Sequence, residues 1–133
     1  MNNTLDSRSI LVVDDSQDVL LVLRTSLEIE GFKVFTAESG AEAFELLAKI
    51  PEPNLILLDM ILEDMTGAEF LEQLENNFPQ IFAEVPVVYH SGMTEIPDHK
   101  AAGFIRKPTD RLEFLNAISR YIEVGQHPPY RHN

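Results

Sequence analysis

One segment near the middle of the chain limits most strongly what the chain can fold into. Leu55–Leu58 is a run of four apolar residues that leads directly into Asp59. A strand that is covered on both faces loses the alternation of polar and apolar residues, so this run indicates a central strand of a parallel sheet. Open α/β sheets bind their ligands beyond the carboxyl ends of the strands. We therefore expect Asp59 to lie at a ligand-binding edge of such a sheet.

Short apolar strands and amphipathic helical segments alternate along the chain. The residue pattern predicts strands over residues 9–13, 32–37, 55–58, 85–90 and 104–106. It predicts helices over residues 17–30, 40–50, 68–78 and 111–124. This alternation is typical of an α/β domain with a doubly wound, five-stranded parallel sheet and helices on both faces. We expect one domain over residues 9–124, with a flexible N-terminus at 1–8 and a flexible tail at 125–133.

The composition narrows the classes of function that fit the chain. The formal net charge of −12 argues against direct binding of nucleic acid, because such binding depends on neutralising phosphates. The sequence has no cysteine, no apolar run long enough to span a membrane and no signal peptide, so we expect a cytoplasmic protein without membrane contact. Nine acidic residues and one base lie between Glu42 and Glu75, which indicates a solvated helical face or a docking surface for a basic partner.

Polar residues follow the expected strands at the points where the strands end. Asp14 and Asp15 follow the first strand, Asp59 the third, Ser91 the fourth and Lys107 the fifth. The carboxyl ends of parallel strands meet at one edge, so these side chains are expected to converge. Taken alone, each fits an ordinary turn, and the first two could simply cap the next helix. Together, three carboxylates, a hydroxyl and an ammonium indicate an Mg²⁺ site and a carboxylate that can accept a phosphoryl group.

Four motifs at these strand ends resemble the receiver domains of response regulators, the phosphate-accepting modules of two-component signalling. They are Ile10–Asp15, Leu57–Asp59 with Gly67 eight residues later, Val87–Gly92 and Gly103–Pro108. The resemblance extends over about residues 8–124 and is to receiver domains like those of the chemotaxis regulators. It implies a flavodoxin-like fold with the strand order 2-1-3-4-5.

The resemblance also implies roles for the residues of the acidic site. Asp59 matches the phosphoacceptor, and Lys107 matches the lysine that pairs with the phosphoryl group. Asp15 matches the direct Mg²⁺ ligand, while Asp14 beside it acts largely through water. The backbone carbonyl of Ile61 matches a further ligand. Mg²⁺ is therefore the expected cofactor.

Two further residues resemble the switch by which the family reports phosphorylation to its partners. Ser91 matches the switch hydroxyl. Phe104, three residues before Lys107, matches the switch aromatic. The alternative is that Phe104 is an ordinary core residue.

The chain departs from the family pattern at three places. Leu62 and Glu63 stand where most members have a Met-Pro pair. Ile61 and Met93 are apolar at positions that flank the path of the hydrolytic water, which predicts a comparatively long-lived aspartyl phosphate. Only residues 92–102 separate the fourth and fifth strands, so the helix that the family places there should be absent or reduced to about one turn.

The resemblance implies a stand-alone, single-domain response regulator. It would accept a phosphoryl group on Asp59 from a histidine kinase or a histidine phosphotransfer protein and would signal to an unknown downstream protein. We expect a monomer or weak dimer that catalyses only its own phosphorylation and dephosphorylation and is not otherwise an enzyme. The alternative is a receiver-fold interaction module that works without phosphorylation. A phosphohydrolase is disfavoured because Ile61 stands two residues after Asp59, where a general acid would be needed.

Overall fold

The computed structural model describes residues 8–92, 100–107 and 109–125. Its strands are β1 (Ser9–Val13), β2 (Lys33–Ala37), β3 (Leu55–Leu58), β4 (Val87–Ser91) and β5 (Gly103–Arg106). Its helices are α1 (Gln17–Ile29), α2 (Gly40–Leu47), α3 (Gly67–Asn77), α4 (Pro79–Glu84) and α5 (Arg111–Val124). The strands form one parallel sheet in the order β2-β1-β3-β4-β5, which confirms the expected order.

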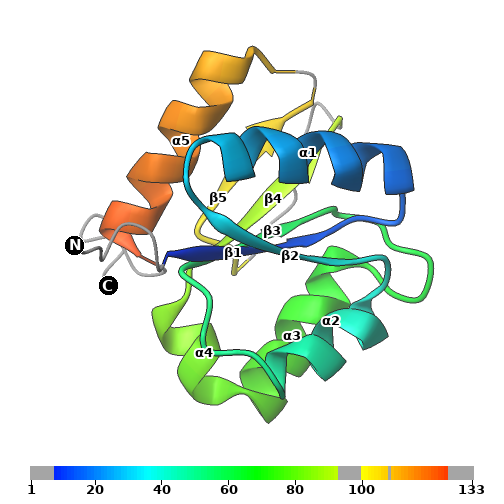
Figure 1. The fold of residues 1–133 in the computed structure, drawn as a ribbon. Coiled ribbons are helices and arrows are strands. Elements are labelled where there is room, and N and C mark those ends of the chain that lie inside the picture. The colour runs from blue at the N-terminus through cyan, green and yellow to red at the C-terminus, as the bar shows by residue number, and fades with distance from the viewer. Residues whose placement is uncertain (1–7, 93–99, 108, 126–133) are drawn as a thin grey trace.

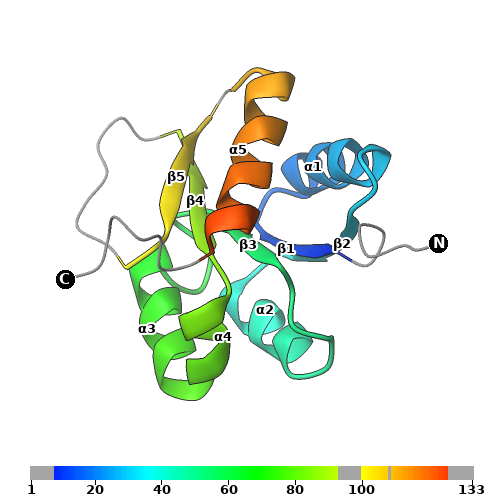
Figure 2. The same ribbon diagram turned by 90° about the vertical axis from the view of Figure 1, so that its left-hand side faces the viewer.

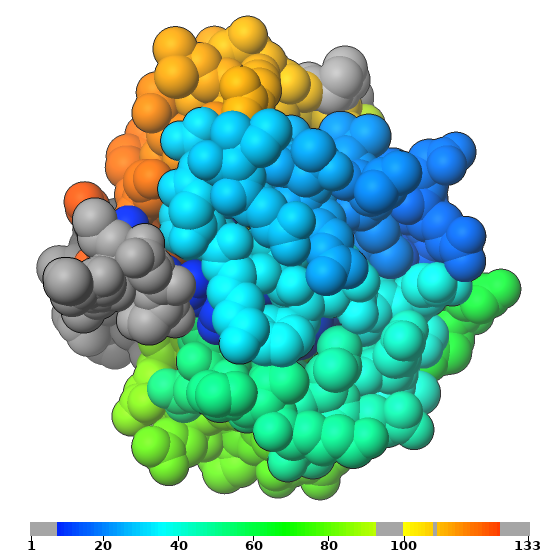
Figure 3. Space-filling model, viewed as in Figure 1, coloured from blue at the N-terminus to red at the C-terminus, as the bar shows by residue number. Residues whose placement is uncertain are grey.

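Helices cover both faces of this sheet (Figure 1). α1 and α5 lie on one face, and α2, α3 and the short α4 lie on the other, as the perpendicular view also shows (Figure 2). The space-filling view shows α1 and α2 together on one side of the molecule, with the edge strand β2 between them (Figure 3). The arrangement confirms the doubly wound, flavodoxin-like sheet.

β3 occupies the centre of the sheet, as its apolar sequence predicts. It pairs with β1 on one side and β4 on the other, and its four residues are at most 1% exposed. The hydrogen bonding continues one residue beyond the strand, because the Asp59 N–H donates to the Val13 carbonyl at 3.0 Å. The Asp14 N–H likewise donates to the Ala37 carbonyl at 3.1 Å. These two bonds hold both aspartates at the carboxyl edge of the sheet.

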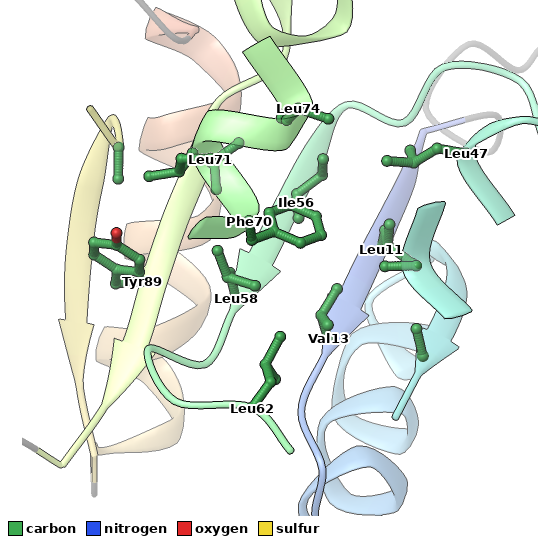
Figure 4. Close-up of a cluster of buried hydrophobic side chains, with 14 of the residues drawn as sticks. Leu11, Val13, Leu47, Ile56, Leu58, Leu62, Phe70, Leu71, Leu74 and Tyr89 are labelled. Carbon is green, nitrogen blue, oxygen red and sulfur yellow. The ribbon is translucent and has the colours of Figure 1, made fainter. Parts of the chain in front are cut away.

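Two apolar cores, one on each face, attach the helices to the sheet. On the α2–α3 face, Phe70, Leu71 and Leu74 of α3 pack against residues of β1, β3 and β4 (Figure 4). On the α1–α5 face, the fully or almost fully buried helix residues are Leu20, Leu23, Leu27, Phe114 and Ile118. Each such side chain contributes about 1.5–3 kcal/mol through its removal from water, so both layers are firmly anchored.

The chain between α3 and β4 forms a helix that the sequence analysis missed. α3 ends at Asn77, one residue before the predicted end, and Pro79 begins α4. Proline is tolerated at the start of a helix because its fixed φ suits the first turn and its missing N–H would have no partner there. β4 therefore begins at Val87, later than residue 85, and it includes Ser91.

Leu112 is one of the apolar residues of the helix predicted over 111–124, but its side chain faces solvent and the residue is 66% exposed. A helix turns by about 100° per residue, so Leu112 faces away from Phe114, which fills the core instead.

The segment between β4 and β5, where a reduced helix was expected, is only partly described. Gly92 and residues 100–102 are not helical, which is consistent with a reduced helix, while residues 93–99 lie outside the described residues. The flexible ends expected at 1–8 and 125–133 also fall almost entirely outside them.

Candidate functional site

Three carboxylates meet at the carboxyl edge of the sheet, as predicted. Asp14 and Asp15 follow β1 and Asp59 follows β3, and one oxygen of each lies within 4.8 Å of an oxygen of the other two. Asp14 is buried, Asp59 is half-buried and Asp15 is exposed, so the cluster opens toward solvent on one side. All the donors are oxygens, which is the donor set that Mg²⁺ prefers. The residues present therefore fit the expected cofactor.

Lys107 supplies an internal counter-charge to this cluster. Its Nζ lies 2.9 Å from Oδ2 of Asp14 and 4.0 Å from Oδ2 of Asp59. Its backbone N–H donates to the Ser91 carbonyl at 2.7 Å, which ties the end of β5 to the end of β4. One ammonium cannot balance three carboxylates, so the site keeps an excess negative charge. A divalent cation would remove that excess.

Asp14 is fixed on both of its carboxylate oxygens. Oδ1 accepts a hydrogen bond from the Ser16 backbone N–H at 2.9 Å, and Oδ2 accepts one from Lys107 at 2.9 Å. Ser16 in turn caps α1, because its side chain accepts from the Val19 N–H. The residue that caps α1 is therefore Ser16, and not Asp14 or Asp15 as the alternative had it. The Asp14 carboxylate belongs to the acidic site.

The surroundings of Asp59 make its carboxyl group harder to ionise. Burial raises the pKa of Asp59 above its ordinary value, and the nearby charges of Asp14 and Asp15 raise it further. The Lys107 ammonium and a hydrogen bond from the Ile61 backbone N–H act in the opposite direction without cancelling the rise. A bound cation stabilises the ionised carboxylate, and this stabilisation matters most where the folded chain otherwise disfavours that form.

This pKa shift predicts that Asp59→Asn stabilises the metal-free protein at neutral pH. An acid whose pKa is higher in the folded than in the unfolded chain costs stability progressively as the pH rises from the unfolded value through the folded one. The variant should therefore have a higher urea midpoint than wild type at pH 7 in EDTA, and the gain should shrink toward about pH 4. The exposed Asp18→Asn is the control and should show no such gain. A gain that grew in acid would contradict the assignment.

The loop between β3 and α3 brings the backbone of Ile61 beside Asp59. Ile61 and Thr66 form an isolated antiparallel bridge, and the Gly67 N–H donates to the Met60 carbonyl at 2.6 Å. The loop is thus closed upon itself at its base. The Ile61 side chain is 63% exposed, so the apolar group expected beside the hydrolytic water does face solvent.

Asp64 ties this loop to α2, a contact that the sequence analysis missed. Its carboxylate accepts hydrogen bonds from the backbone N–H groups of Gly40 at 2.9 Å and Ala41 at 3.0 Å. Burial pushes the pKa of Asp64 upward, but these bonds outweigh it and lower the pKa. Leu62 and Glu63 leave the loop without the family's proline, and the Asp64 tether supplies a restraint of another kind. No local pattern could have indicated a partner 24 residues away.

The two switch candidates lie on β4 and β5 close to this edge. Ser91 is buried and is the last residue of β4. Phe104 is half-buried on β5, packs against the α2–α3 core, and donates its backbone N–H to the Tyr121 hydroxyl at 3.3 Å. This packing fits the alternative that Phe104 is an ordinary core residue, and its role as a switch stays a prediction. Met93 lies outside the described residues.

The comparisons with known proteins agree with this geometry. The family model of the response regulator receiver domain matches residues 10–119, so the chain belongs to the family of response regulator receiver domains. Its structure is similar to the chemotaxis response regulator CheY4 of Vibrio cholerae, with a TM-score of 0.76 and 26% identity, covering 86% of this chain and 98% of that one. A CheY-like receiver domain protein from Methanospirillum hungatei gives a TM-score of 0.77 at 26% identity, covering 88% and 94%.

Curated relatives are longer proteins. The transcriptional regulatory protein KdpE of Mycobacterium tuberculosis is 33% identical over 112 residues, which are 80% of this chain and 47% of KdpE. The transcriptional regulatory protein GlrR of Escherichia coli is 31% identical over 120 residues, which are 86% of this chain and 26% of GlrR. The chain thus spans about half the length of the first and a quarter of the second. The transcriptional regulation in their names is stated of those longer proteins.

Membership of the family establishes the general class of function. Receiver domains are regulatory modules of two-component systems and not enzymes in the ordinary sense, and they interact with histidine kinases or phosphotransfer proteins. Receiver domains generally bind Mg²⁺, and the carboxylates of Asp14, Asp15 and Asp59 could hold such an ion. None of the helices within the described residues combines the length and apolar character needed to cross a membrane.

Proposed function

We propose that the chain accepts a phosphoryl group on Asp59 from a histidine kinase or a histidine phosphotransfer protein, with Mg²⁺, and that phosphorylation changes its binding to a downstream partner. The observation that carries this proposal is the placement of Asp59 within 4.8 Å of two other carboxylates and 4.0 Å from an ammonium group. We place this function in the cytoplasm.

The chemistry requires a nucleophile and compensation of charge. An Asp59 carboxylate oxygen would form a bond to phosphorus while the phosphorus–nitrogen bond of phosphohistidine breaks, and the electron pair of that bond would leave with the imidazole. Lys107, whose Nζ lies 4.0 Å from Asp59, would pair with the negative charge of the transferred group. Bound Mg²⁺ would supply further neutralisation of the phosphoryl oxygens.

The proposed metal ligands divide into direct and indirect ones. Asp15 is exposed and would bind the ion directly, together with Asp59 and the backbone carbonyl of Ile61. Asp14, whose two oxygens already accept hydrogen bonds, would act mainly by orienting water and Lys107. This division is consistent with a Mg²⁺ site that keeps several waters.

The proposed response to phosphorylation runs through β4 and β5. The Ser91 hydroxyl would donate to a phosphoryl oxygen, and Phe104 would change position together with the end of β5. The hydrogen bond between Lys107 N–H and the Ser91 carbonyl connects the two strand ends, so a shift of either residue affects both strands.

The proposal is tested by incubating the chain with Mg²⁺ and phosphoramidate and measuring its intact mass. Wild type should gain one phosphoryl group, and Asp59→Asn or EDTA should prevent the gain. The exposed Asp18→Asn should gain the group as wild type does. Absence of a gain in wild type would favour the interaction module that works without phosphorylation. Repeated turnover of a small phosphoester would favour a phosphohydrolase.

The exposed Ile61 side chain predicts a slow loss of the phosphoryl group. An asparagine at this position could hold the hydrolytic water by hydrogen bonding, so Ile61→Asn should accelerate decay of the phosphorylated protein severalfold, as followed by intact mass after removal of the donor. Ile29→Asn is the matched control, because Ile29 is also exposed, at 67%, but lies on α1. Equal or slower decay in Ile61→Asn would contradict the prediction.

A further inference from the structure

A cavity of about 540 Å³ lies on the α1–α5 face, and among its described lining residues it shares only Lys107 with the phosphorylation site proposed above. Its walls come from α1, from the ends of β4 and β5 and from the start of α5. The side chains that matter for its chemistry are Val19, Val22, Leu23, His90, Lys107 and Phe114. The volume falls within the usual range of sites for small molecules, about 300–1,000 Å³, and the lining is mainly apolar.

His90 makes this cavity more than an apolar gap. The side chain lies on β4, is only 7% exposed, and its Nδ1 is buried without a hydrogen-bond partner among the described residues. Its ring packs against Phe114 with centroids 5.5 Å apart. A buried polar atom without a partner costs stability, and native proteins usually satisfy such atoms. The unpartnered Nδ1 is itself enclosed by protein atoms, but the His90 ring lines the open cavity and is a polar group that a ligand in the cavity meets.

The charge state of His90 restricts what this ligand can be. Burial and the Lys107 ammonium lower the pKa of His90 to about 4, although Asp14 opposes the shift, so the imidazole is neutral at neutral pH. A neutral imidazole carries one donor nitrogen and one acceptor nitrogen. A hydroxyl group can serve either nitrogen because it both donates and accepts, whereas a carboxylate can only accept.

The cations at the cavity do not favour an anionic ligand. Lys107 is paired with Asp14 at 2.9 Å, and Arg111 lies 3.5 Å from Glu30. The carboxylate of Asp18 adds a negative charge to the lining. A neutral ligand with an apolar body is therefore the better match, and apolar cavities of proteins do take up small aromatic rings.

We propose that this cavity binds a small aromatic molecule with one hydroxyl group, a phenol, whose ring lies among the apolar side chains and whose hydroxyl is hydrogen-bonded to His90. The site would be a second binding site of the domain, on the face that carries α1 and α5. It does not depend on phosphorylation of Asp59, so it can be tested on the unmodified chain without divalent cation.

The test is a titration of the isotope-labelled full chain with phenol and with toluene, followed by amide NMR. Toluene has the same size and lacks the hydroxyl. Wild type should show saturable shifts that concentrate at the cavity residues, and phenol should bind about fivefold more tightly than toluene, as one hydrogen bond of ordinary strength implies. Shifts that do not saturate, or that scatter over the surface, would overturn the proposal.

Two variants and one control make the test specific. Ser26→Phe, which places a ring in the cavity from α1, should abolish binding of both probes. Thr25→Phe makes the same type of change on an exposed position of α1 that does not line the cavity, and it should bind like wild type. His90→Leu should remove the preference for phenol, so that phenol binds no more tightly than toluene. Binding that survives Ser26→Phe would overturn the site, and an unchanged preference for phenol in His90→Leu would overturn the role of His90.

Discussion

Lys107→Met is expected to lower the free energy of unfolding by roughly 2–3 kcal/mol in the absence of divalent cations. The substitution keeps the apolar stem but removes the ammonium that lies 2.9 Å from Asp14, a side chain only 3% exposed. Breaking one partner out of a buried ion pair costs about 3–5 kcal/mol, and the value here is reduced because the Lys107 side chain is 26% exposed. Urea unfolding in EDTA measures the loss.

The same variant should respond more strongly than wild type to Mg²⁺. Without the ammonium, a cation no longer competes with Lys107 for the carboxylates, so Mg²⁺ should bind more tightly and restore much of the lost stability. Lys100→Met is the control, because Lys100 pairs with Glu75 at 2.7 Å but both side chains are largely exposed, at 62% and 43%. It should unfold as wild type does and show no added response. Equal behaviour of the two variants would contradict the role given to Lys107.

Gly67→Ala is the second substitution with a large expected effect, about 2–3 kcal/mol of lost stability. A Cβ at Gly67 would lie 2.6 Å from Cε1 of Tyr89 and 3.3 Å from the Met60 backbone. Tyr89 is only 2% exposed, so its ring has little room to move away, and the β3–α3 loop would have to shift instead. Chemical denaturation measures the cost, and weaker Mg²⁺ binding should accompany it.

Gly92→Ala and a double mutant provide the controls for this prediction. Among the described residues, a Cβ at Gly92 would meet only the Lys107 carbonyl oxygen at 3.9 Å, so this change should be nearly neutral. Reducing the opposing side chain with Tyr89→Leu should make Gly67→Ala less costly than it is in wild type, because the two residues are in contact. An equal cost in both backgrounds would show that the packing against Tyr89 is not the cause.

The strand-end residues could be predicted from the sequence because one physical rule governs them. Leu55–Leu58 shows by its lack of alternation that it is buried on both faces, and a parallel sheet then fixes the edge at which Asp59 emerges. The same rule placed Asp14, Asp15 and Lys107, and the structure brings all four together. Their roles in phosphorylation remain predictions until the chemistry is measured.

Features that depend on contacts between distant segments could not be predicted in this way. The tether from Asp64 to Gly40 and Ala41 leaves no local pattern. α4 has six residues, which is too short for an amphipathic period to be visible. His90 stands in an apolar run, but which face it occupies depends on the register of β4 within the sheet, and a shift of one residue would reverse it.

The most direct test of the central claim is to locate the phosphoryl group itself. An acyl phosphate is reduced by borohydride to an alcohol, so a phosphorylated aspartate becomes homoserine, which peptide mass spectrometry can assign to one position. After treatment with Mg²⁺ and phosphoramidate, conversion is expected at Asp59 alone and should disappear in EDTA. Conversion at Asp14 or Asp15, or no conversion in protein that remains folded, would contradict the account.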